Sequence, residues 1–184
     1  MRSRADCITL DAGDPLAPLR DLFELPAGVV YLDGNSLGAL PKSTAARLET
    51  VIRSEWGNGL IRSWNSAGWI DLAQRIGERI GPLVGAGPGE LIVADSTSVN
   101  LYKVLSAAAA IVKADSPKRN VIVSERGNFP TDLYIAESVA RQHGFELKLV
   151  DRTEIAAHLD ERLALLLLTH VDYRSGRMHE MAET

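Results

Sequence analysis

The stretch that decides the fold is NVIVSERGNFPTDLYIAESVARQHGFELKLVD, residues 120–151. It opens with a short apolar run at 120–125, rich in β-branched residues, which is typical of a buried strand. Residues 131–144 then repeat apolar side chains at helical spacing, and a second short apolar run follows at 145–151. A strand, a helix and a strand in this order predict two parallel strands joined by a crossover helix.

The same alternation continues on both sides of this stretch. Upstream, residues 90–95 (ELIVAD) predict a buried strand and 99–113 a helix; downstream, residues 152–161 predict a helix and 163–171 another strand. Strands that are apolar on both faces and separated by helices form a parallel sheet covered on both sides. We therefore predict an α/β fold. Ligands of such sheets bind at the carboxyl ends of the strands.

The first part of the chain is mainly helical. A helix is predicted to begin at Pro41 and to end at the Gly-Asn-Gly of 57–59, as a left-handed cap would end it. A second amphipathic helix ends at Gly85. Residues 29–31 suggest a short strand, and DGNSLG at 33–38 a glycine-rich turn.

This change of pattern divides the chain. We predict an N-terminal arm and first helix in residues 1–60, and the first part of a large α/β domain in residues 61–184.

Composition excludes several classes of partner. The 20 Lys and Arg residues against 24 Asp and Glu residues give a net charge of −4, with no basic stripe for nucleic acid. The single Cys7 can form neither an internal disulfide nor a metal cluster, which fits a reducing cytosol. The start of the sequence resembles no signal peptide, and the longest apolar run, 163–168, is too short to span a bilayer. We expect a cytoplasmic protein without metal.

Polar residues follow three of the predicted strands at one edge of the sheet. Asp95 to Ser98 follow the first strand and open a helix, where free N–H groups and hydroxyls favour an anion; simple helix capping is the alternative. Phe129 and Asp132 follow the second strand, either as a stacking ring with a polar partner or as a hydrophobic staple with a cap. Thr169 and His170 follow a third, and for His170 a structural role is favoured over catalysis.

Together these loops suit an aromatic phosphate cofactor. A dinucleotide is disfavoured because neither G-x-G-x-x-G nor the Walker pattern follows any strand.

Five motifs in register resemble the N-terminal half of bacterial kynureninase: YLDGNSLGALP, EWGNGLIRSWNSAGW, DSTSVNLYKVLSAA, NFPTDLYIAE and LLTHVDYRSGRMH. The resemblance covers essentially the whole chain. It implies the large domain of the aspartate-aminotransferase-like fold (PLP fold type I), cut before its C-terminal domain. It also implies a cytoplasmic homodimer that uses pyridoxal 5'-phosphate (PLP) to hydrolyse L-kynurenine, and 3-hydroxykynurenine, to anthranilate and L-alanine. That reaction belongs to tryptophan catabolism, the kynurenine pathway and NAD biosynthesis.

The resemblance also assigns residues. Thr97 and Ser98 would contact the cofactor phosphate, Phe129 would stack on the pyridine ring, and Thr169 would contact the cofactor from the later strand. The cofactor loop would be completed by Pro130, Thr131 and Asp132. The substrate pocket near the dimer interface would be lined by Trp64, for which a packed aromatic is an equal alternative, and by the loop around Asn35 and Ser36.

No catalytic residue is identified in this chain. In the family the Schiff-base lysine and the pyridinium aspartate come later, so we expect an N-terminal portion that, alone, is poorly soluble, binds PLP weakly and is inactive. Two alternatives stay open. One is another PLP enzyme of this fold, such as a cysteine desulfurase or an aminotransferase. The other is a truncated, non-catalytic homologue that binds a phosphate ligand or pairs with a full-length subunit.

Overall fold

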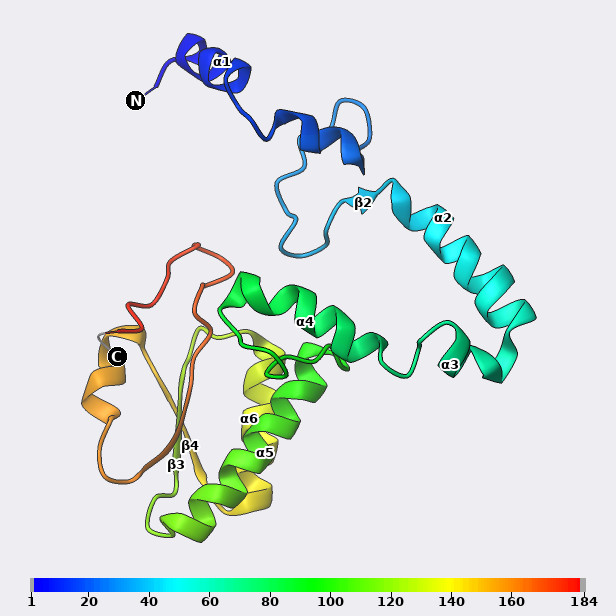
Figure 1. Cartoon of the computed structure of the whole chain (residues 1–184). Coiled ribbons are helices and arrows are strands. Elements are labelled where there is room, and N and C mark those ends of the chain that lie inside the picture. The colour runs from blue at the N-terminus through cyan, green and yellow to red at the C-terminus, as the bar shows by residue number, and fades with distance from the viewer. Residues whose placement is uncertain (1, 183–184) are drawn as a thin grey trace. The chain divides into compact units, whose positions relative to one another are not determined.

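The chain forms two compact units that divide between Ile92 and Val93 (Figure 1). A computed structural model describes residues 2–182. The division separates the helical first half of the sequence from the half in which strands and helices alternate. The predicted grouping of residues 61–184 in one large domain stays a prediction.

A three-stranded parallel sheet organises the second unit. Its order is β4-β3-β5, so that the strand of residues 120–125 lies in the centre. Val121 pairs with Glu146 on one side and Ile122 with Leu165 on the other. The strands predicted at 120–125, 145–151 and 163–171 are thereby confirmed, with the bounds β3 (Val121–Glu125), β4 (Glu146–Val150) and β5 (Leu163–Leu167).

Helices cover one face of this sheet and a 3-10 segment covers the other. The helices α5 (Thr97–Asp115) and α6 (Pro130–His143) bury Ala109 and Val139 against each other and against apolar side chains of the sheet. On the opposite face, η4 (Arg152–His158) buries Ile155 against Val121, Val123 and Val150. In Figure 1, α5 and α6 lie together on one side of the strands and the orange η4 on the other. The strands are apolar on both faces because both faces of the sheet are covered.

The first unit is built from short elements. The longest is α4, whose end at Gly85 is confirmed: this glycine has φ +75°, the left-handed conformation that glycine adopts at low cost. The two short strands pair in antiparallel fashion. The elements are α1 (Arg4–Ala12), η1 (Ala17–Leu22), β1 (Phe23–Glu24), β2 (Leu40–Pro41), α2 (Ser43–Thr50), the π-helix η2 (Val51–Asn58), η3 (Leu60–Arg62), α3 (Ser63–Ser66) and α4 (Leu72–Val84).

Three sequence expectations for local structure were wrong. Residues 90–95 do not form a strand, and Ile92 is 66% exposed. A strand needs a hydrogen-bonded neighbour, and residues 90–95 pair with none of the three strands of the described sheet. The strand expected at 29–31 is absent, while the turn after it forms, with Leu37 N–H bonded to the Asp33 carbonyl. Gly59 has φ −77°, so no left-handed cap ends the preceding helix.

Glu55 organises the region that contains the three tryptophans, Trp56, Trp64 and Trp69. Its carboxylate accepts a hydrogen bond from Trp69 Nε1 at 2.7 Å and pairs with Arg47, and its carbonyl accepts one from Ser63 Oγ at 2.5 Å. The Arg47 and Trp69 donors lower the pKa of the Glu55 carboxyl. The short helix α3, which carries Trp64, is therefore attached to η2 through Ser63.

Candidate functional site

One pocket of about 360 Å³ collects polar and aromatic residues from three separate loops of the second unit. The residues come from the start of α5, from the loop before α6 with its first turn, and from the segment after β5. Six of the seven cofactor residues named from the sequence line this pocket; Pro130, the first residue of α6, lies between two of them in the chain. The lining residues are Thr97, Ser98, Phe129, Thr131, Asp132, Thr169 and Tyr173.

The start of α5 leaves its first two hydroxyls uncommitted to helix capping. Ser96 is the capping residue, because its Oγ accepts a hydrogen bond from Val99 N–H at 3.4 Å. Thr97 and Ser98 follow as the first two helical residues, whose N–H groups have no acceptor within the helix. Both residues line the pocket. Ser96 therefore fills the capping role. This leaves Thr97 and Ser98 as the candidates for binding an anion at this helix start.

Phe129 presents a half-exposed ring to the pocket. It is the N-cap residue of α6, with an extended backbone, and its side chain is 47% exposed. The Tyr173 ring meets it edge to face, with 5.1 Å between the centroids, and the Arg174 guanidinium lies 4.9 Å from the centroid of Tyr173. The alternative of an inward-packed staple does not fit this exposure. The Phe129 ring instead offers an aromatic surface to a planar ligand.

Asp132 lies in the first turn of α6 and faces the same pocket. Burial raises the pKa of its carboxyl. Its side chain forms no cap for the helix, because the N-cap is Phe129 and no side-chain cap hydrogen bond is present. A partly desolvated carboxyl in a pocket is a group that a ligand with a complementary donor or charge would stabilise.

A buried asparagine that the sequence reasoning missed connects these loops. Asn128 Oδ1 accepts hydrogen bonds from Thr169 Oγ1 at 2.6 Å and from Phe129 N–H at 2.7 Å. Asn128 Nδ2 lies 3.4 Å from Ser124 Oγ, and that hydroxyl donates to the Leu167 carbonyl at 2.9 Å. The polar residues of NFPTD indicate a loop, but they do not predict this hydrogen-bond network, because the network depends on the pairing between β3 and β5.

The segment after β5 returns on itself and supplies Tyr173. A bridge joins Val171 to Met178, and His179 N–H donates to the His170 carbonyl at 2.9 Å. His179 is buried, with 6% of its surface exposed, and its Nε2 lies 3.1 Å from Glu125 Oε2 at the end of β3. This contact attaches the segment to the sheet. His170 itself is exposed and does not line the pocket.

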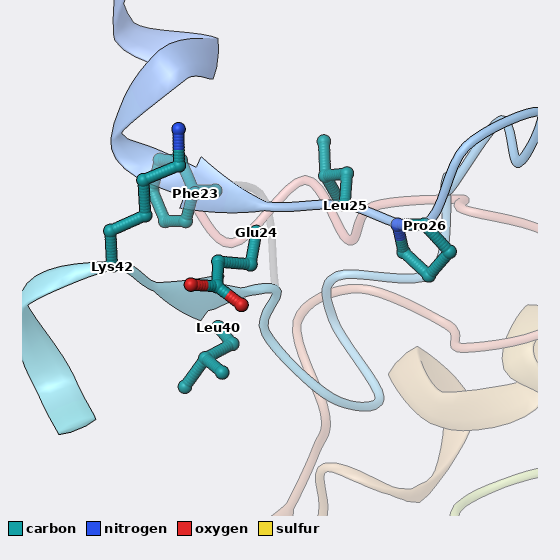
Figure 2. Close-up of a pocket in the computed structure, with 6 residues that line it drawn as sticks. All are labelled: Phe23, Glu24, Leu25, Pro26, Leu40 and Lys42. Carbon is teal, nitrogen blue, oxygen red and sulfur yellow. The ribbon is translucent and has the colours of Figure 1, made fainter.

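The substrate residues named from the sequence all lie in the first unit. Trp64 is in α3 with its side chain half exposed, and Asn35 and Ser36 form the turn after Asp33. A larger hollow of about 560 Å³ lies beside β1 and β2, but none of these three residues lines it. In Figure 2 the Lys42 amine and the Glu24 carboxylate in that hollow extend in opposite directions. Its polar groups are therefore not directed toward one point.

The sheet, its pocket and a solved structure together give the fold class. A parallel sheet covered on both faces, with the pocket beyond the carboxyl ends of its strands, fits the large domain of the aspartate-aminotransferase-like fold. The crystal structure of DndA from Streptomyces lividans matches 78% of this chain and 41% of its own chain with a TM-score of 0.62. The two sequences are 20% identical, so this match concerns the fold alone. The predicted fold class is confirmed.

Curated kynureninases match the sequence over nearly its whole length. The chain is 57% identical to kynureninase from Pseudomonas fluorescens, 53% to that from Burkholderia pseudomallei and 52% to that from Burkholderia mallei. Each match covers 98% of this chain and 44% of the relative, so the chain spans less than half the length of these proteins. No protein-family model matches. The resemblance to kynureninase that the five motifs predicted is confirmed.

None of the helices in residues 2–182 combines the length and apolar character needed to cross a bilayer.

Proposed function

We propose that the complete protein containing these residues is a kynureninase, which uses PLP to hydrolyse L-kynurenine, and 3-hydroxykynurenine, to anthranilate and L-alanine. The observation that carries the proposal is the convergence of six residues from three distant segments on one pocket, combined with 57% identity to a curated kynureninase. The proposal includes a cytoplasmic homodimer and a place in tryptophan catabolism and NAD biosynthesis.

The residues around the pocket fit PLP by their chemistry. Hydroxyls at a helix start are suited to a phosphate, because the helix N–H groups and partial positive charge favour an anion. We assign this role to Thr97 and Ser98. A flat aromatic cofactor ring needs an aromatic face, which we assign to Phe129, while Pro130 and Thr131 complete the loop around it. Thr169 supplies a polar group from the segment after β5.

When bound, PLP supplies an electron sink for bond cleavage next to the substrate amine. This chain's own residues would bind and orient the cofactor. The partly desolvated Asp132 carboxyl would interact with a donor on it, and Tyr173 would keep the Phe129 ring in place. We propose that Trp64, Asn35 and Ser36 line the substrate side, and that the lysine and acid that complete the chemistry belong to the remainder of the protein.

The phosphate assignment is tested with the full-length protein and two ligands, PLP and pyridoxal, which lacks the phosphate. Thr97→Val combined with Ser98→Ala removes both hydroxyls. Because a hydrogen bond to a charged group contributes about 1.5–3 kcal/mol, PLP affinity should fall at least about tenfold while pyridoxal affinity stays unchanged. Ser116→Ala, at the far end of the same helix, is the matched control.

Two outcomes would count against the proposal. Equal loss of PLP and pyridoxal affinity in the double variant would contradict the phosphate role of Thr97 and Ser98. Full PLP binding by the wild-type protein without anthranilate release from kynurenine would contradict the hydrolase and favour a non-catalytic homologue or another PLP enzyme, which a screen of amino-acid substrates would separate.

A further inference from the structure

The buried Asn128 side chain lies where three segments meet. It is 7% exposed and does not line the pocket itself. Its contacts reach Thr169 after β5, Phe129 at the start of α6 and Ser124 within β3. Two of these partners, Thr169 and Phe129, line the pocket. Asn128 would therefore not touch a ligand in the pocket, but it contacts Thr169 and Phe129, which would.

The hydrogen bonds determine which way the Asn128 amide faces. The Phe129 N–H group can only donate, so the atom 2.7 Å from it must be the amide oxygen. The Thr169 hydroxyl oxygen lies 2.6 Å from that same oxygen, and one of the two must supply a proton. An amide oxygen carries none. The proton is therefore that of Thr169, and it points toward Asn128.

The hydrogen bond to Asn128 limits the bonds that the Thr169 hydroxyl can form with a ligand. A hydroxyl has one proton and two lone pairs. With its proton bonded to Asn128, the Thr169 hydroxyl offers the pocket only acceptor lone pairs, so that a group binding there must be a donor. The same amide oxygen fixes the backbone N–H of Phe129 and hence the start of α6. One side chain thereby controls both the polarity of Thr169 and the placement of the aromatic ring.

We propose that Asn128 is a positioning residue for the cofactor site, acting through Thr169 and Phe129. The inference rests on the proposed function. It predicts that removing the Asn128 oxygen weakens PLP binding although Asn128 does not touch PLP. It also predicts that the effect depends on the Thr169 hydroxyl being present.

The test uses the full-length protein and PLP titration followed by the absorption of the bound cofactor. Asn128→Ala should weaken PLP binding about tenfold, since it removes the three side-chain hydrogen bonds of Asn128 and leaves the Phe129 N–H group without its acceptor. Asn128→Asp keeps the oxygen that Thr169 and Phe129 contact but replaces the Nδ2 donor to Ser124 Oγ by an acceptor, so its PLP affinity should lie between those of wild type and Asn128→Ala. Asn120→Ala, at the other end of β3, is the matched control and should bind as wild type.

A double-mutant cycle separates positioning from general destabilisation. If Asn128 acts through Thr169, Asn128→Ala combined with Thr169→Val should weaken binding less than the product of the single effects, by a factor of about three or more. Strict additivity, or equal weakening in Asn128→Asp and Asn128→Ala, would overturn the inference. So would Asn128→Ala binding PLP as wild type does. A wild-type protein that binds no PLP would overturn the proposed function itself.

Discussion

Replacing Phe129 by alanine should separate stability from cofactor binding. The residue is 47% exposed, so about half of its surface is removed from water on folding. Full burial of such a side chain contributes about 1.5–3 kcal/mol, and half of that is about 1 kcal/mol. The edge-to-face contact with Tyr173 adds about 0.5–1.5 kcal/mol. The free energy of unfolding without ligand should therefore fall by only about 1–3 kcal/mol.

The loss of PLP affinity should be at least as large. A ring that stacks on an aromatic side chain gains about 1–3 kcal/mol, which corresponds to a factor of about 5–150 in the dissociation constant. The assay is chemical unfolding of the full-length protein with and without PLP, together with PLP titration. Because Phe129→Ala weakens binding, PLP should raise the unfolding free energy of the variant less than that of wild type at the same concentration.

Phe145 supplies a matched control of the same residue type. It packs against the core between α5 and α6, away from the pocket lining. Phe145→Ala should lower the free energy of unfolding by about 2–4 kcal/mol, as loss of a core aromatic does, and leave the PLP dissociation constant unchanged. The reasoning is refuted if Phe129→Ala binds PLP as wild type does, or if both substitutions weaken PLP binding equally.

Two further predictions concern a helix contact and the pocket carboxyl. In α4, a Cβ added at Gly77 would lie 2.1 Å from the Leu91 carbonyl oxygen, whereas at Gly81 it would lie 3.3 Å from the Ala86 oxygen. Gly77→Ala should therefore cost about 2 kcal/mol or more despite better helix propensity, and Gly81→Ala about zero; equal unfolding midpoints would contradict this. Burial raises the Asp132 pKa, so its contribution to stability is present below the carboxyl's unfolded pKa and is lost as pH rises through the folded pKa. Without PLP, Asp132→Asn should therefore match wild type in acid and unfold at higher temperature near neutral pH. A difference in unfolding temperature between Asp132→Asn and wild type that shrinks with rising pH would contradict this prediction.

Much of the second unit could be predicted from local sequence pattern. Short apolar runs at 120–125 and 145–151 became strands because each is covered on both faces, and the helix between them has its apolar side on the sheet. The first residues after such strands gather at one edge by topology, which is why Phe129 and Thr169 could be expected together. Thr97 lines the same pocket although the residues before it, 90–95, form no strand.

The parts that were missed depend on partners far away in the sequence. The run ELIVAD has the composition of a strand, but without a neighbour for its backbone groups it remains irregular. Tyr173 reaches the pocket only because the segment after β5 turns back and is attached through His179 to Glu125. Asn128 and Thr169 are brought together by the pairing of β3 with β5. No periodicity in the sequence encodes these contacts.

The return of the chain after β5 has a consequence for the order of synthesis. The pocket takes Thr97 from the first helix of the unit and Tyr173 from its last segment. A nascent chain that has left the ribosome only as far as β5 therefore has one side of the pocket without the other. Under the proposed function, PLP would stabilise the fold by mass action only once both sides of the pocket are present, so the three-stranded sheet would have to form without help from the cofactor.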